Sequence, residues 1–279
     1  MLELLAMPFF SRALIALLAT GVAFPVLGTF ILNLELIPAR FAVMHAALLG
    51  AACALILKLN PTVTAMTASL LAGLIITLIS WRGSVSAGGS LGLIMTVSLG
   101  LSFIIFYKAN VHAIEAFNLF WGSILTLTSG DTILVMGIAG ALLLFISLAY
   151  KEIQIVLYDR ELAWAVGVPA KCIYGAIMLS VCLGIAVAMR VTGALLIDAV
   201  TILPALAASQ IGKTFKELII WGSVIGVAMN LSGFALSFLW DLPVSPGIIV
   251  IGAGLILLMR GIKALHIREE PPEQKRGVS

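Results

Sequence analysis

The sequence predicts an all-α membrane protein with about eight or nine transmembrane helices, and three observations support this. Of the 279 residues, 62% are hydrophobic and 10% are charged, whereas soluble domains average about 45–50% apolar and about 25% charged residues. The mean hydropathy is +1.18. The apolar residues form continuous runs, not the alternating pattern of a membrane barrel. This composition excludes a disordered chain and argues against a soluble enzyme.

In the N-terminal half, four apolar segments are separated by residues that carry charge or end a helix. A polar turn with Glu35, Pro38 and Arg40 follows the first segment. Asn60-Pro61 follows the second, and a stretch rich in glycine and serine over 83–90 follows the third. The predicted spans are 12–32, 41–57, 63–80 and 91–107.

The C-terminal half holds five more segments that are long enough to cross a membrane. Residues 118–128 are too short and are predicted to be re-entrant or the first part of a broken helix. The other interruptions are a long polar connection at 151–171, Arg190, a loop at 212–217 and a turn at 241–247. The predicted spans are 132–150, 172–189, 191–211, 218–240 and 248–265.

The distribution of basic residues predicts how the chain lies in the membrane. Lysine and arginine gather in 151–171, in 212–217 and after the last span, and two predicted spans separate each group from the next. All three groups can therefore lie in the cytoplasm, where basic residues concentrate. We expect a single transmembrane domain over 1–265 and a charged cytoplasmic tail over 266–279. If the chain crosses the membrane nine times and ends in the cytoplasm, Met1 lies outside. A different number of crossings within 118–150 would place Met1 in the cytoplasm instead.

Within the polar connection, one segment has the pattern of a short amphipathic helix. Asp159 suits its N-cap, Glu161 suits the first turn, and Gly167 and Pro169 suit the end. Trp164 is a residue type that anchors helices at a membrane surface. The helix can therefore rest on lipid or dock a soluble partner, and the local sequence favours neither.

Two ionisable residues lie inside apolar segments, where such residues are costly and commonly functional. Asp198 lies far from either end of segment 191–211, with Thr201 on the same helical face. It is either a neutral group bonded to a neighbouring helix or a cation ligand beside a water-lined path. His45, in segment 41–57, is either a hydrogen-bonding group between helices or a ligand.

Motifs for catalysis are missing from the sequence. The phosphate-loop-like element Gly212-Lys213-Thr214 has Ala207 where the motif needs glycine. The cysteines lie in apolar runs without metal-ligand spacing. A net charge of +3 is too small for nucleic-acid binding. We expect no enzyme activity in this chain, no permanently bound cofactor and no nucleic-acid partner.

Several segments, taken in order, form a pattern that extends over about residues 8–265. They are FSRAL (10–14), MHAALLG (44–50), FWGSIL (120–125), DRELA (159–163) with GV (167–168), VTGALL (191–196) leading to ILPA (202–205), and DLP (241–243) with PG (246–247). Together they resemble the membrane permease subunit of the ATP-binding cassette (ABC) importers that take up zinc, manganese or iron.

The resemblance implies a multi-pass permease of the cell (inner) membrane that works as a homodimer among membrane lipids. A divalent metal ion would be the cargo, with the path at or near the subunit interface. An extracytoplasmic metal-binding protein would deliver the ion, and two copies of a cytoplasmic ATP-binding subunit would drive transport. The resemblance places the docking of that subunit at Asp159, Glu161, Ala163 and Gly167.

The chain departs from the family pattern at the positions expected to meet the ion. The family usually has aspartate where this chain has Phe41, serine at Met44 and proline at Leu49, and a small or hydroxyl residue at Asp198. We hypothesise that Asp198 supplies the missing carboxylate and faces His45 across the path, as a transient metal site. The loss of aspartate at position 41 also allows a metal chelate as the substrate.

Two alternatives from other classes stand beside the importer. The chain could be a secondary transporter that uses Asp198 as its proton or cation site. It could also be a membrane scaffold that transports nothing, because its many small residues allow dense helix packing.

Overall fold

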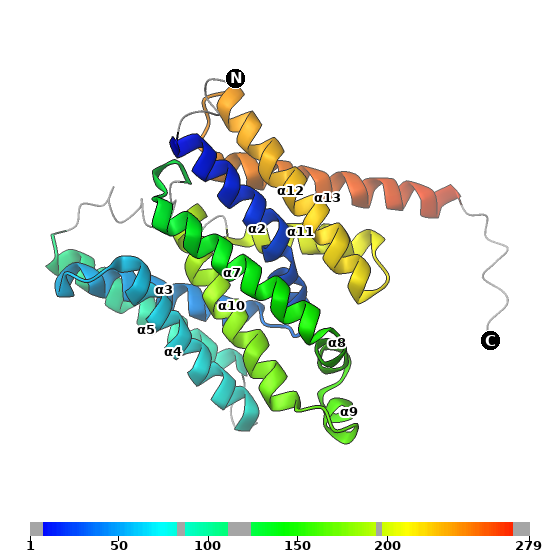
Figure 1. The fold of residues 1–279 in the computed structure, drawn as a ribbon, viewed down its shortest axis with the longest axis horizontal. Helices are drawn as coiled ribbons and strands as arrows, with labels where there is room; N and C mark the ends of the chain where they lie inside the picture. The colour runs from blue at the N-terminus through cyan, green and yellow to red at the C-terminus, as the bar shows by residue number, and fades with distance from the viewer. Residues whose placement is uncertain (1–7, 83–86, 111–123, 194–196, 270–279) are drawn as a thin grey trace.

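The computed structural model describes residues 8–82, 87–110, 124–193 and 197–269, and within these ranges every regular element is a helix. The predicted all-α fold is confirmed (Figure 1). The elements are α2 (Pro8–Asn33), α3 (Ile37–Leu57), α4 (Pro61–Arg82), α5 (Ala87–Lys108), the 3-10 turn η1 (Ile124–Thr126), α7 (Ser129–Leu148), α8 (Tyr150–Tyr158), α9 (Arg160–Ala165), α10 (Ala170–Thr192), α11 (Ile197–Ile211), α12 (Phe215–Leu239) and α13 (Val244–Glu269).

Eight of the described helices are long and apolar enough to cross a membrane, which agrees with the predicted number. The predicted span at 191–211 is wrong in its extent. Helix α10 continues through position 190 and ends at Gly193, whose φ of +77° is in the left-handed region that glycine adopts readily. Helix α11 then covers 15 described residues, which at 1.5 Å per residue is about 22 Å and less than a bilayer core.

The polar connection predicted at 151–171 is mostly helical. Helix α8 forms there because its apolar residues recur at helical spacing, and Ile153 and Val156 are buried against the bundle. Helix α9 follows directly, with Asp159 between the two helices. At the other end of the chain, α13 runs to Glu269, so the first residues of the predicted tail are helical.

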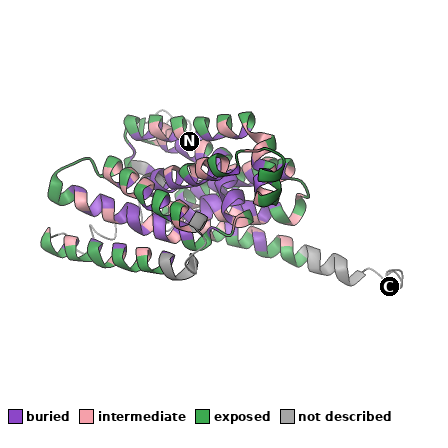
Figure 2. Ribbon diagram, turned by 90° about the horizontal axis from the view of Figure 1, so that it is seen from below, coloured by how far each residue is buried: buried purple, intermediate pink, exposed green. Residues whose placement is uncertain are grey.

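Helix α2 lies at the centre of the bundle and packs against α7, α10, α11 and α12 (Figure 1). Helices α3, α4 and α5 form a group on one side, while α11, α12 and α13 lie on the other. Figure 2 shows buried positions in the middle of the bundle and exposed positions along its outer helices. The outer faces of α4, α5 and α13 carry exposed apolar residues, as expected for surfaces against lipid or another subunit.

Small residues and one buried amide hold α2 close to its neighbours. The Asn230 side chain of α12 donates a hydrogen bond of 2.8 Å to the Leu17 carbonyl oxygen and one of 3.3 Å to Thr20 Oγ1. Farther along α2, Gly28 lies directly against the backbone of α11 at Thr201. Such close backbone approach between membrane helices requires small residues.

Replacing Gly28 with alanine is expected to destabilise the bundle by about 1–3 kcal/mol, because the added methyl group overpacks a tight contact. It would overlap the Thr201 carbonyl oxygen and lie 2.9 Å from the Ala205 methyl carbon. Gly137→Ala is the control, since among the described residues nothing lies within 4 Å of a Cβ at that position. Thermal unfolding of the purified protein in one detergent measures both. Equal melting temperatures for the two variants would contradict the prediction.

Candidate functional site

Helix α9 begins at an aspartate cap and ends at a glycine. Asp159 Oδ1 accepts hydrogen bonds from the backbone N–H groups of Glu161 (2.7 Å) and Leu162 (3.0 Å), which confirms the predicted N-cap. After the helix, the Val168 N–H donates to the Ala163 carbonyl oxygen at 2.9 Å. Gly167 has a φ of +83°, which confirms its predicted role at the end of the helix.

The residues of α9 divide into an inner group and an outer group. Ala163 is fully buried and fixes the helix against the bundle. Trp164 keeps 80% of its surface exposed, and Leu162 and Val166 are exposed beside it. Together with Glu161, these exposed residues give α9 an outward face of mixed apolar and acidic character.

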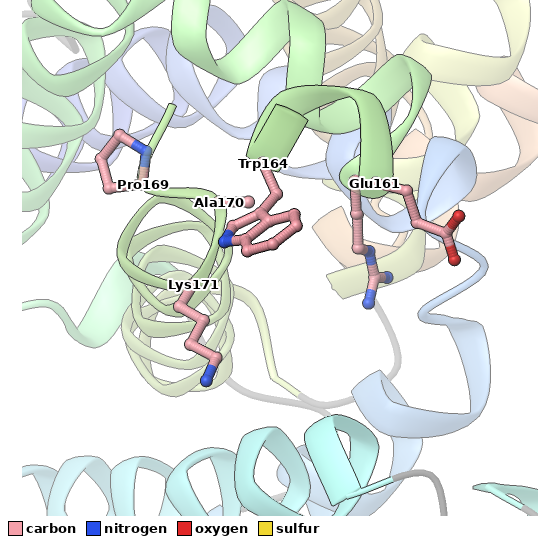
Figure 3. Close-up of a pocket in the computed structure, with 6 residues that line it drawn as sticks. Glu161, Trp164, Pro169, Ala170 and Lys171 are labelled. Atoms are coloured by element: carbon pink, nitrogen blue, oxygen red, sulfur yellow. The ribbon is translucent and has the colours of Figure 1, made fainter. Parts of the chain in front are cut away.

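A pocket of about 790 Å³ lies between α9 and the start of α10 (Figure 3). In Figure 3 the Trp164 indole lies beside Ala170, while the Glu161 carboxylate points away from it. The Arg160 guanidinium stacks on the Tyr174 ring, 4.1 Å from its centroid. The lining residues are Arg160, Glu161, Trp164, Pro169, Ala170 and Lys171. A concave surface with an exposed indole and charges of both signs suits a protein segment.

Removing the cap at Asp159 is expected to loosen α9. Asp159→Ala loses both hydrogen bonds to the first turn, at a cost of about 1 kcal/mol. Asp159→Asn is the control, because asparagine caps a helix about as well as aspartate. Hydrogen exchange of the Glu161 and Leu162 amides, followed by mass spectrometry, should be faster in the alanine variant alone. Equal exchange in the two variants would mean that the cap does not hold this helix.

A second polar site joins the start of α3 to the start of α11. Arg40 was expected in a turn, but α3 begins at Ile37 with Pro38 in its first turn, a position that proline favours, so Arg40 is helical. Both terminal nitrogens of Arg40 bind the Asp198 carboxylate, and the contact from Nη2 to Oδ2 is 3.2 Å. The guanidinium also lies over the Phe41 ring, 4.1 Å from its centroid.

The two side chains of this pair differ in how far they are buried. The Arg40 side chain is 1% exposed and that of Asp198 is 44% exposed. Asp198 lies in the first turn of α11 and not in the middle of a span, so the helix dipole favours its carboxylate. Within the described ranges, no acceptor lies within hydrogen-bonding distance of the buried Nε of Arg40.

His45 is buried one turn after Phe41 on α3. Its Nδ1 lies 2.7 Å from the Phe41 carbonyl oxygen, a geometry in which Nδ1–H donates and Nε2 keeps a free lone pair. Asp198 pairs with Arg40 and not with His45. Within the described parts of the chain, no three His, Cys, Asp or Glu side chains gather as a metal site.

Sequence reasoning missed the contribution of Arg40. The available signal was an arginine beside an apolar segment and an aspartate inside another, because charges in membranes commonly pair. Most of the short segment predicted at 118–128 lies outside the described residues, and its last part includes η1.

These features define a polytopic transport subunit: long apolar helices, a shorter helix of 15 described residues that carries a partly open carboxylate, and a short exposed helix between two spans. The chain belongs to the ABC 3 transport family, whose model matches residues 6–262. It is therefore a multi-pass permease subunit in the cell membrane, as predicted, and not a secondary transporter. An importer of this class works with ATP-binding subunits and a substrate-binding protein.

Three similar proteins cover nearly the whole chain. The manganese import system permease protein ScaB of Streptococcus gordonii is 28% identical over 90% of this chain and 90% of its own length. The chelated iron transport system membrane protein YfeD of Yersinia pestis is 23% identical over 98% and 93%. The solved structure of PsaBC from Streptococcus pneumoniae, in complex with Fab, has a TM-score of 0.81 and 27% identity over 92% of this chain and 93% of that one.

Proposed function

We propose that this permease imports a divalent metal ion, with manganese as the first candidate and iron or zinc as the others. The observation that carries the proposal is the partly open Asp198 carboxylate in the first turn of α11, a helix shorter than a full span. Carboxylate oxygen and imidazole nitrogen are ligands that all three ions accept. ScaB and YfeD, the relatives described above, are named for manganese and for chelated iron.

His45 and Asp198 form the transient site in this proposal. The Nε2 lone pair of His45 is available to a cation, since Nδ1 faces the Phe41 carbonyl oxygen. A carboxylate has about four lone-pair positions, so Asp198 keeps acceptor capacity beyond its two contacts with Arg40. An ion would be held briefly by these groups and by water, as transport requires.

The working assembly in this proposal is a homodimer with the path at or near the subunit interface. Two ATP-binding subunits dock on α9 from the cytoplasmic side, where Glu161 and Trp164 make contact and Asp159, Ala163 and Gly167 hold the helix in place. The basic residues near α9 and in the loop before α12 support a cytoplasmic position for both. An extracytoplasmic metal-binding protein supplies the ion on the other side.

Metal uptake in cells tests the proposed substrate. A strain that carries the permease with its ATP-binding subunit and its metal-binding protein should accumulate radioactive manganese, and unlabelled iron or zinc should compete if they share the path. His45→Gln should reduce this uptake at equal amounts of protein in the membrane. Equal metal contents with and without the permease, for all three ions, would rule out the proposal.

A metal chelate is the second candidate, and the partly open stripe of α3 favours it. Phe41 and Met44 are only half-buried and lie three residues apart on one face of α3, so this stripe is apolar. An apolar surface suits an organic chelator better than a hydrated ion. Uptake of an iron chelate that free iron does not compete with would favour this reading over the bare ion.

A further inference from the structure

The Arg40–Asp198 pair is unexpected at a cation site, because a positively charged side chain occupies the candidate ligand. A cation ligand is normally free to offer its negative charge, yet here both carboxylate oxygens contact a guanidinium of the same chain. The pair carries no net charge, so an arriving ion meets a carboxylate that is already neutralised.

The surroundings of Arg40 are unfavourable for its positive charge. Its side chain is 1% exposed, and among the residues described nothing accepts a hydrogen bond from its Nε. It also lies near the N-terminus of α3, where the helix dipole opposes a positive charge. The two contacts that offset these costs are the Asp198 carboxylate and the Phe41 ring. Arg40 therefore depends on Asp198, the one ion-pair partner that its side chain has among the described residues.

Asp198, in contrast to Arg40, is partly exposed. Its side chain is 44% exposed in the isolated chain, so part of it is open to water or an ion. The two ends of the pair thus have fixed roles, with a buried cation behind an accessible anion. An ion that binds Asp198 must share it with Arg40, because the arginine side chain is 1% exposed and has no other carboxylate partner among the described residues.

We propose that Arg40 is a tethered counter-ion of the transport site, which competes with the transported cation for Asp198 and so keeps the ion weakly held. The inference rests on the proposed function, since it assumes that the ion visits Asp198. Transport needs binding that is strong enough for entry and weak enough for release. Competition from Arg40 lowers the affinity of Asp198 for the ion. After the ion has left, Arg40 again neutralises the Asp198 carboxylate.

Manganese binding to the purified permease in lipid nanodiscs tests this directly. Arg40→Gln removes the competing charge and should tighten manganese binding by about tenfold or more, because one unit charge beside a partly buried carboxylate has an effect of this size. In cells with the ATP-binding subunit, the same variant should transport manganese more slowly at saturation, because release is slower. Arg40→Lys keeps the competing charge, although not the two-nitrogen contact, and should therefore tighten manganese binding much less than Arg40→Gln does.

A charge exchange tests whether the ion needs the carboxylate at the exposed end of the pair. In the double variant Arg40→Asp with Asp198→Arg, the pair can form again but the carboxylate becomes the buried partner. A melting temperature near that of the unchanged protein, together with loss of manganese binding, is the expected result. Normal manganese uptake by this double variant would overturn the inference.

Two single variants distinguish failure of the inference from failure of the proposed function. If Asp198→Asn abolishes manganese binding while Arg40→Gln leaves it unchanged, Asp198 is a ligand but Arg40 does not compete, and the inference is wrong. If Asp198→Asn binds manganese as well as the unchanged protein does, the proposed transport site itself is wrong.

Discussion

Asp198→Ala is expected to lower the stability of the folded permease by about 3 kcal/mol or more, because it leaves the Arg40 charge buried and unpaired. The reverse truncation should cost much less. Arg40→Met keeps most of the apolar volume, and the Asp198 carboxylate that remains is 44% exposed and can be hydrated. The stability effect of breaking this pair should therefore depend strongly on which partner is removed.

Thermal unfolding of the purified variants in one detergent measures this asymmetry. The double variant Arg40→Met with Asp198→Ala is the control, since replacing both charges of a buried pair by apolar groups is commonly close to neutral. It should recover most of the loss seen in Asp198→Ala. If Arg40→Met destabilises the protein as much as Asp198→Ala does, the burial difference between the two side chains does not govern the energy of the pair.

Trp164→Ala is expected to abolish ATP-driven uptake by releasing the ATP-binding subunit from α9. Buried tryptophans at protein interfaces commonly contribute about 2 kcal/mol or more, which is about thirtyfold in affinity. Trp164 is 80% exposed in the isolated chain, and its indole lines the pocket between α9 and α10 (Figure 3). Co-purification of the ATP-binding subunit with the tagged permease, followed by manganese uptake, measures the effect.

Tyr107→Ala is the matched control for Trp164→Ala, because Tyr107 is an equally exposed aromatic residue, 83%, on α5. It should leave co-purification unchanged. Glu161→Lys should weaken docking as Trp164→Ala does, since it reverses a charge on the same outward face. If Trp164→Ala keeps the ATP-binding subunit and only loosens α9 from the membrane, the indole is a lipid anchor and the docking proposal fails.

The spans and the caps could be predicted from the sequence because they are local. A helix in lipid must satisfy its own backbone hydrogen bonds and present apolar side chains, so a run of about 20 apolar residues identifies it. The Asp159 cap and the Gly167 end follow from the preferences of single residues and were placed correctly. The segment 191–211 was misjudged because hydropathy alone does not reveal that a helix ends at Gly193.

The candidate ion site could be predicted only in part. Asp198 and His45 stand out because ionisable residues are rare in apolar segments. The contact of His45 with the Phe41 carbonyl oxygen lies within one helix and follows from helical spacing. The partner of Asp198 does not follow from any local pattern, and the hypothesis that it faces His45 remains a proposal.

The sequence by itself determined that this protein is an apolar bundle of membrane helices with a short capped helix between two spans. It also identified two ionisable residues, His45 and Asp198, inside apolar segments. Only the tertiary structure decided that Asp198 meets Arg40, 158 residues away, and that the arginine is the buried partner. The physical reason is that helix formation and membrane insertion depend on neighbours along the chain. Which charges meet, and which of them keeps its access to water, depends instead on how α3 and α11 are placed in the folded bundle.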